Sequence, residues 1–286
     1  METQNAIEIH GVCKDYTNFQ LKDISFQVPS GSIMGIIGEN GAGKTTTIKL
    51  ILNSITKSAG SIKVFGLDHV NDEKQIKRDI GVVLDESYFH ESLKPMEIAK
   101  ILSKLYTNWD DPLFSHYLKT FRIPNNTVKQ LSRGTKMKLS LATALSHHPK
   151  LLILDEATGG LDPVVRNEIL DIFLDFIQDE THSILISSHI TGDLEKIADY
   201  ITFIHEGTLV LSEPTDVLLS TYGLLLCGSS QYASIEKKDI LGYRKNAFGY
   251  EVLVKNKQAM KLKYPDCTMD APNLETLMTL YKKEGK

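Results

Sequence analysis

A run of four apolar residues that ends in two acids, Leu151 to Glu156, most constrains how this chain folds. Such a run is typical of a buried parallel strand, which delivers its terminal carboxylates to the C-terminal edge of a sheet. Upstream of it lies a short Ser/Gly-rich segment, Leu131 to Thr135, which we expect to begin a helix and to bind an anion at the helix N-terminus. Together the two segments predict an α/β fold with polar side chains gathered at one sheet edge.

Residues 38–45 predict a phosphate-binding loop (P-loop). Their sequence, GENGAGKT, matches G-x-x-x-x-G-K-[ST] and lies between a predicted strand at 32–37 and a predicted helix at 44–53. Glycines let backbone N–H groups turn towards phosphate oxygens, and the helix start adds partial positive charge. An ordinary glycine turn beside a surface lysine fits this context poorly. We predict that the phosphates of a nucleotide are bound by Gly38, Asn40, Gly41, Ala42, Gly43, Lys44, Thr45 and Thr46.

The two acids after the strand at 151–154 are candidates for metal binding and catalysis. We expect this strand to lie beside the P-loop strand, so that Asp155 binds Mg²⁺ together with the Thr45 hydroxyl. Glu156 would then face the γ-phosphate and polarise the attacking water. Two acids after an apolar run also occur as a strand end with a helix cap, and it is the P-loop that favours the catalytic interpretation.

Two further side chains are candidates because of their positions. His189 follows a predicted buried strand at 183–187, where a neutral imidazole could bond to the γ-phosphate; the alternative is a structural histidine. Tyr16 lies at the first predicted antiparallel strands, where its ring could stack on adenine, although simple packing explains one of eleven tyrosines equally well. Of the other histidines, none is assigned a function, and His147, His148 and His182 are predicted to be solvated helix or loop residues.

The order of the remaining segments predicts a doubly wound sheet with additions. Residues 7–9 and 24–28 alternate apolar and polar side chains, which predicts antiparallel strands. Residues from about 88 to 140 predict a helical insertion, with Asp111 as an N-cap before Pro112. We expect a nucleotide-binding domain over residues 1–221. The rest, 222–286, predicts a small α/β appendage that ends in an amphipathic helix capped by Asn273.

Composition excludes several classes of protein. With 286 residues, 42% of them hydrophobic, the chain can bury one large core and a small one. A formal net charge of -4 gives no basic excess, so no nucleic-acid partner is expected. Three widely spaced cysteines favour free thiols over a disulfide framework or a zinc site. The sequence contains no apolar run of the roughly 18 residues that a membrane span needs, so a membrane role requires a partner protein.

These motifs, in this order and together with Leu161-Asp162-Pro163, make the chain resemble the nucleotide-binding subunit of ATP-binding cassette (ABC) transporters. The resemblance covers residues 5 to about 215. It implies a Mg²⁺-dependent ATPase in which the LSGGQ segment of one subunit completes the ATP site of a second subunit, in a homodimer or a heterodimer. Ser132 and Gly134 would then contact the γ-phosphate of ATP bound to the partner, and Asp162 would lie in the loop that links the two sites.

The resemblance narrows to bacterial single-cassette exporters of the antibiotic and peptide efflux type. The segments that carry this narrower resemblance are Trp109-Asp110, Gly134 to Lys138, Ser187 to His189 and the terminal Pro272 to Met278. It implies export through a separate integral membrane permease, with the helical insertion meeting the permease. The chain would be cytoplasmic and held at the inner face of the cell membrane. Two alternatives stay open: a soluble regulatory cassette protein acting on ribosomes or DNA, and a weakly active partner in a heterodimer.

Three residues depart from the family pattern. Arg133 and Thr135 replace the first glycine and the glutamine of LSGGQ. Where the family usually has a glutamine that touches Mg²⁺ and the permease, this chain has Asp85. A carboxylate there could still bind the metal, but it places additional negative charge near the phosphates.

Overall fold

The fold is taken from a computed structural model that describes residues 5–85 and 88–281. The described residues form two compact units. The first is built from the chain up to Ile190 together with Thr202–Leu211, and the second from Thr191–Ile201 together with the chain from Ser212 onward.

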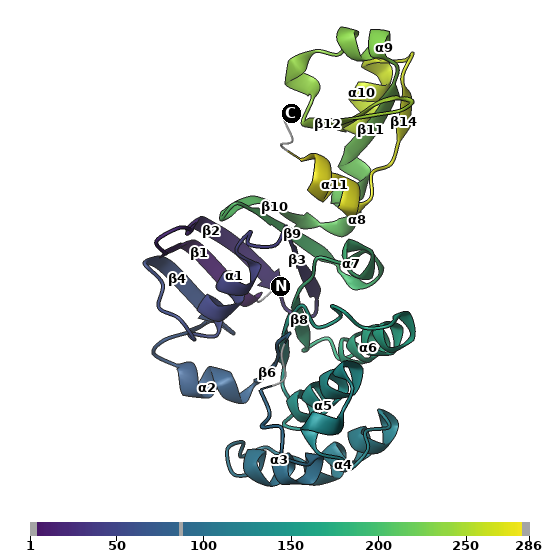
Figure 1. Ribbon diagram of the computed structural model, residues 1–286. Coiled ribbons are helices and arrows are strands. Elements are labelled where there is room, and N and C mark those ends of the chain that lie inside the picture. Colours follow the sequence, from purple (N-terminus) through teal and green to yellow (C-terminus); the bar gives the residue numbers. More distant parts are fainter. Residues whose placement is uncertain (1–4, 86–87, 282–286) are drawn as a thin grey trace. The chain divides into compact units, whose positions relative to one another are not determined.

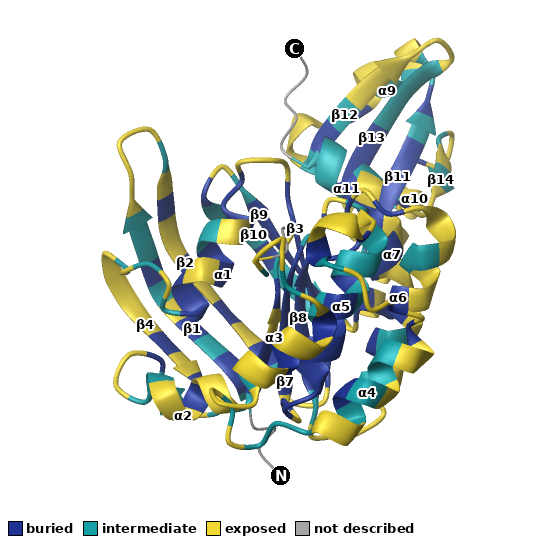
Figure 2. Cartoon of the chain, turned by 60° about the horizontal axis from the view of Figure 1, so that its bottom comes forward, coloured by how far each residue is buried: buried dark blue, intermediate teal, exposed yellow. Residues whose placement is uncertain are grey.

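Strands of the first unit form a mixed sheet, in which the described residues contribute ten strands in the order β5-β4-β1-β2-β10-β9-β3-β8-β7-β6 (Figure 1). Four strands at one end of this order run parallel: β3 (Ile33–Ile37), β8 (Ser183–Ser187), β7 (Leu151–Asp155) and β6 (Ile80–Val83). Every residue of β3, β7 and β8 is buried, as the dark blue strands of Figure 2 show. Burial on both faces explains why these strands are continuous apolar runs.

The parallel order corrects one expectation. The strand that ends in Asp155 does not lie beside the P-loop strand, because β8 pairs with β3 on one side and with β7 on the other. Asp155 therefore pairs in register with Ser187, the last residue of β8. Apolar runs of similar length do not specify which strands become neighbours, so the sequence left this order undetermined.

At the other end of the sheet β1 and β2 pair antiparallel, as predicted, whereas β10 pairs with β2 in parallel. Along β2, Ile24, Phe26 and Val28 are buried and alternate with exposed residues. Opposite faces of a strand thus meet the core and the solvent. The strands are β1 (Asn5–Asp15), β2 (Gln20–Pro29), β4 (Ala59–Val64), β5 (Leu67–Asp68), β9 (Tyr200–His205) and β10 (Thr208–Pro214).

Helices α1 (Lys44–Ile51), α2 (Glu73–Arg78) and α6 (Pro163–Phe176) also belong to this unit. The predicted helical insertion is confirmed, and Figure 1 shows its helices grouped at one end of the unit. It consists of α3 (Pro95–Leu102), α4 (Asp111–Thr120), the 3₁₀ turn η1 (Val128–Gln130) and α5 (Arg133–Leu145).

Of two predicted helix starts, that of α4 differs in its capping residue and that of α5 agrees. Asp110, not Asp111, caps α4, because its extended backbone lets its Oδ1 accept a hydrogen bond from the Leu113 N–H at 2.7 Å. Helix α5 begins at Arg133, because the Ser132 Oγ accepts a hydrogen bond from the Thr135 N–H at 3.2 Å. The Ser/Gly-rich segment is thus a helix N-terminus.

The second unit is built around a sheet whose described strands have the order β12-β13-β11-β14. Its core contains Leu225, Val252 and Val254. Asn273 caps the last helix as predicted, accepting a hydrogen bond from the Thr276 N–H at 2.8 Å. The strands are β11 (Tyr222–Cys227), β12 (Gly242–Asn246), β13 (Gly249–Lys255) and β14 (Thr268–Asp270). The helical segments are α7 (Thr191–Ile197), α8 (Thr215–Thr221), α9 (Ser229–Ser234), η2 (Lys237–Asp239), α10 (Lys257–Lys263) and α11 (Leu274–Leu280).

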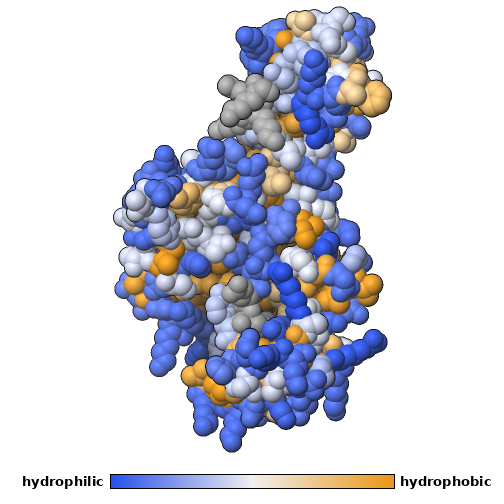
Figure 3. All heavy atoms as spheres, in the orientation of Figure 1, coloured by the Kyte–Doolittle hydropathy of each residue, from blue (hydrophilic) through white to orange (hydrophobic). Residues whose placement is uncertain are grey.

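Within the described ranges, every helix is too short or too polar to cross a lipid bilayer. The hydrophilic colour that dominates Figure 3 agrees with this finding, and its orange residues form separate groups.

His147 is buried, which corrects the prediction that it is solvated. Its side chain lies at the end of α5, 2% exposed, and stacks on Tyr106 with ring centroids 4.1 Å apart. Its Nε2 lies 3.1 Å from the Ile80 carbonyl oxygen and its Nδ1 lies 3.4 Å from that of Thr143. Burial lowers the pKa of His147, and the two carbonyl oxygens oppose this effect only in part.

The lowered pKa of His147 predicts how stability depends on pH. The unfolded chain binds a proton at this residue more readily than the folded chain does, so the free energy of unfolding should fall as pH drops below the ordinary value of 6.5. His147→Asn keeps a donor but does not titrate. It should lose less stability than the wild type between about pH 8 and about pH 5.5 in urea denaturation. An equal loss in both proteins would contradict this interpretation.

Candidate active site

The P-loop joins β3 to α1 and approaches its neighbours so closely that it requires glycine. A Cβ on Gly38 would lie 2.3 Å from the Ile204 carbonyl oxygen. Gly43 has a φ of +115°, and a Cβ there would lie 2.7 Å from Leu21 Cδ1. Because these side chains are absent, the loop can curl over the start of α1 and turn backbone N–H groups towards an anion.

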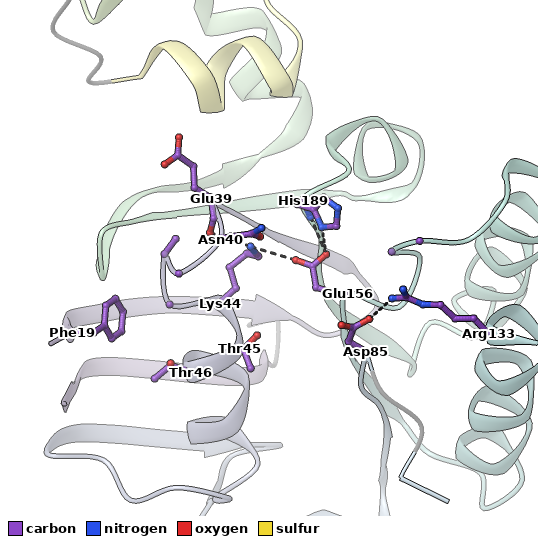
Figure 4. Close-up of a pocket in the computed structure, with 15 residues that line it drawn as sticks. Phe19, Glu39, Asn40, Lys44, Thr45, Thr46, Asp85, Arg133, Glu156 and His189 are labelled. Carbon is purple, nitrogen blue, oxygen red and sulfur yellow. Dashed lines mark hydrogen bonds and ion pairs between the residues drawn. The ribbon is translucent and has the colours of Figure 1, made fainter. Parts of the chain in front are cut away.

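A pocket of about 600 Å³ opens above this loop (Figure 4). The P-loop and the first residues of α1 form one wall, and the loops that follow β7 and β8 form another. The predicted residues that the structure brings together here are Asn40, Gly41, Ala42, Gly43, Lys44, Thr45, Thr46, Asp85, Glu156 and His189. The sequence therefore identified most of the pocket, because its motifs lie at adjacent strand ends.

Lys44 is buried, and its ammonium group has three oxygen neighbours. Its Nζ donates to the carbonyl oxygen of Gly38 at 2.8 Å and to that of Glu39 at 3.3 Å. It also lies 3.3 Å from Glu156 Oε1. A phosphate group in the pocket would replace the Glu156 carboxylate as the partner of this ammonium group.

Glu156 connects Lys44 to His189. Its Oε2 contacts His189 Nδ1 and accepts a hydrogen bond from the His189 backbone N–H at 3.2 Å. The φ of Glu156 is +53°, a left-handed conformation that is uncommon for this residue type. The Glu156 N–H donates to both the carbonyl oxygen and the Oγ of Ser187 at 3.1 Å, which holds this conformation. Backbone strain of this kind clusters at functional sites.

Asp155 lies below the pocket rather than in its lining. It is 5% exposed, and its Oδ1 accepts a hydrogen bond from Ser187 Oγ at 2.5 Å. Among the described contacts of Asp155 there is no basic side chain that would compensate its charge. A buried carboxylate of this kind suits a bound cation, and the Thr45 hydroxyl on the facing pocket wall is a second oxygen ligand of the type Mg²⁺ prefers.

Ser132, Gly134 and Asp162 lie outside this pocket and line a second one of about 330 Å³. Asp162 caps α6, with its Oδ1 accepting hydrogen bonds from the N–H groups of Val164 and Val165 at 3.1 Å. The residues expected to serve a partner's ATP are thus gathered on a separate surface of the same unit.

Asp85 and Arg133, the two departures from the family pattern that reach the first pocket, contact each other. Arg133 Nη2 lies 2.6 Å from Asp85 Oδ1. Both side chains line the first pocket, and Arg133 also lines the second.

Phe19, not Tyr16, is the aromatic residue in the lining of the first pocket. Tyr16 is 47% exposed, and its ring lies 6.4 Å from that of Phe19 and under the Lys14 ammonium group. Sequence reasoning missed Phe19 because the turn between β1 and β2 carries two aromatic residues and no pattern distinguishes them.

Ser187 was also missed as a functional residue. It was assigned to a buried strand, and its hydroxyl joins Asp155 to the backbone of Glu156. The sequence shows a polar residue at the end of an apolar strand. This residue indicates a contact with Asp155 only once β8 is known to pair with β7.

Comparison with known proteins agrees with this geometry. A family model described as "ABC transporter" matches residues 21–159. The bacitracin transport ATP-binding protein of Bacillus licheniformis is 35% identical over 68% of this chain, which spans 65% of that protein, just under two thirds. The lantibiotic transport ATP-binding protein of Streptococcus pyogenes is 34% identical over 68% of this chain and 85% of that protein. Among solved structures, an ATP-binding subunit of an ABC transporter superposes with a TM-score of 0.67 at 25% identity, over 74% of this chain and 90% of that one.

The position of Phe19 predicts which aromatic ring supports the nucleotide base. Phe19→Ala should weaken ATP binding by about fivefold or more, the effect expected for one base–aromatic stack. Tyr16→Ala is the matched control and should change the affinity by less than about twofold. Titration of each purified variant with a fluorescent ATP analogue gives both dissociation constants. A larger loss in Tyr16→Ala than in Phe19→Ala would assign the stacking role to Tyr16.

Proposed function

The chain belongs to the ABC transporter family, as one of its ATP-binding subunits and an ATPase, and we propose that it works in a dimer that drives export through a separate membrane permease. The observation that carries this proposal is the line of contacts from Lys44 through Glu156 to His189 at the pocket wall. It provides a cation for phosphate, a carboxylate base and an orienting imidazole (Figure 4).

Hydrolysis follows from these positions. When the triphosphate draws Lys44 to its β- and γ-phosphates, the Oε1 of Glu156 is released towards the pocket. It accepts a proton from a water that attacks the γ-phosphorus, while the bond from that phosphorus to the bridging oxygen of ADP breaks. His189 keeps the other carboxylate oxygen in place through its backbone and its ring. Nδ1 is engaged by Glu156, so a bond to the γ-phosphate would come from Nε2.

Magnesium fits the oxygen ligands of Thr45 and Asp155. Bound there, it would offset the negative charge of the phosphate oxygens. The buried position of Asp155 and its bond to Ser187 fix the direction of this carboxylate before the metal arrives.

The separation of the two pockets supports dimerisation. Ser132 and Gly134 lie outside the chain's own ATP pocket, at an N-terminus of α5 whose N–H groups can bind an anion. In a head-to-tail dimer this surface would meet the γ-phosphate in the partner's pocket. The partner is a second subunit of the same kind, either a copy of this chain or a related chain.

Export is proposed because the similar proteins are named for bacitracin and lantibiotic transport. The permease would dock on the helical insertion. There Met96, Ile101 and Leu105 expose apolar side chains at 49%, 48% and 71%. Figure 3 shows orange residues at the end of the unit where Figure 1 places α3. The chain would then lie on the cytoplasmic face of the membrane, held there by the permease.

The variant Glu156→Gln tests both the catalytic role of Glu156 and the association of the chain with a membrane permease. The amide cannot accept the proton, so we expect ATP hydrolysis to fall by about 10²- to 10⁴-fold while ATP still binds. Phosphate release and nucleotide binding measure the two effects separately.

The same variant tests the permease. When it is tagged and purified in the presence of ATP from bacterial membranes solubilised in detergent, a multi-span membrane protein should copurify with it. Unchanged turnover would refute the role of Glu156, and copurification with ribosomes or DNA would refute export.

Complementation between two inactive variants tests the shared site. Lys44→Ala removes the cation of the chain's own pocket, and Gly134→Asp places a carboxylate on the surface meant for the partner's ATP. Each homodimer should be inactive. A mixed dimer contains one intact pocket facing one intact surface, so mixing should restore up to about half of the wild-type activity per mixed dimer. Gly134→Asp should still bind ATP, which controls for folding. The absence of any recovery would contradict the head-to-tail arrangement.

A further inference from the structure

Asp85 and Arg133 close one side of the ATP pocket with an ion pair between distant parts of the first unit. Asp85 follows β6, and Arg133 is the first residue of α5 in the helical insertion. Figure 4 shows the two side chains pointing towards each other across the pocket wall. The guanidinium group also lies against Gly160, where an added Cβ would be 2.5 Å from Arg133 Nη1. Gly160 thus leaves room for Arg133 to reach Asp85.

Two of the carboxylates that line the pocket lie against basic side chains. The lining carries the carboxylates of Glu39, Glu156 and Asp85, with Asp155 buried below. Lys44 neutralises Glu156 at 3.3 Å, and Arg133 neutralises Asp85 at 2.6 Å. When Lys44 is drawn to the phosphates, Arg133 still compensates Asp85. Without Arg133 the pocket would present a free carboxylate to a polyanion.

We infer that Arg133 is a positioning residue that keeps Asp85 directed away from the phosphates and from magnesium. Asp85 is then not the metal ligand that the sequence predicted, and Arg133 is the reason that this chain tolerates an acid at that position. This inference rests on the proposed function, because it requires ATP in this pocket. The ion pair is half exposed on both sides and therefore contributes little to folding, so its effect should appear in nucleotide affinity.

Substitutions of Arg133 and Asp85 should affect ATP affinity differently if Asp85 is neutralised by Arg133 than if Asp85 binds magnesium. Removing the arginine should weaken ATP binding, since it frees the carboxylate. Removing the carboxylate as well should restore binding, since the carboxylate that the arginine neutralised is then absent. If Asp85 bound magnesium instead, its removal would weaken binding whether or not the arginine is present.

The test compares Arg133→Ala, Asp85→Asn and the double variant of the full chain. ATP dissociation constants are measured by equilibrium dialysis, once with magnesium and once with a chelator. We expect Arg133→Ala to weaken binding by about two- to fivefold in both conditions. Asp85→Asn and the double variant should stay within about twofold of the wild type. The loss in Arg133→Ala should shrink at high salt, as expected for repulsion between exposed charges.

Lys77→Ala provides a matched control. Lys77 pairs with Glu73 on α2, with side-chain exposures of 51% and 38%, and neither residue lines the ATP pocket. This variant should bind ATP as the wild type does, so a loss in Arg133→Ala cannot reflect the general removal of a surface ion pair.

Several outcomes would overturn the inference. Additive losses in the double variant would show that Arg133 and Asp85 act separately. A loss in Asp85→Asn that occurs only with magnesium would make Asp85 a metal ligand. A failure of the proposed function is distinguishable, because the wild type itself would then not bind ATP, or Lys44→Ala would bind it equally well.

Discussion

The site depends on the parallel register of β3, β8 and β7. This register ends three buried strands at one sheet edge, so the P-loop, Ser187 and the Asp155–Glu156 pair emerge side by side. Ser187 then links the Asp155 carboxylate to the backbone of Glu156, with its hydroxyl donating to Asp155 Oδ1 and accepting from the Glu156 N–H. These bonds hold the left-handed backbone of Glu156, so that Asp155 is buried while Glu156, the next residue, lines the pocket.

Lys44 and Glu156 depend on each other for their positions. The Lys44 ammonium group lies 3.3 Å from Glu156 Oε1 and donates to two carbonyl oxygens of the P-loop. In the proposed mechanism the phosphates take the place of Glu156 beside this ammonium group, so the carboxylate becomes available as a base when a nucleotide is bound.

Local motifs allowed much of this site to be predicted. The P-loop, Asp155, Glu156 and His189 each lie at a strand end that their own segment specifies. Features that arise from long-range contacts were not predictable: the insertion of β8 between β3 and β7, the burial of His147 against Tyr106, and the contact of Arg133 with Asp85 across 48 residues of sequence. Such contacts depend on which elements pack together, and neither periodicity nor spacing records that choice.

The start of α5 contributes to both pockets because consecutive residues of a helix N-terminus point in different directions. The Ser132 side chain caps the helix and Gly134 lines the second pocket, whereas Arg133 between them reaches back to Asp85 in the first. Arg133 lines both pockets, so its ion pair with Asp85 lies between the chain's own pocket and the surface proposed to meet the partner's ATP.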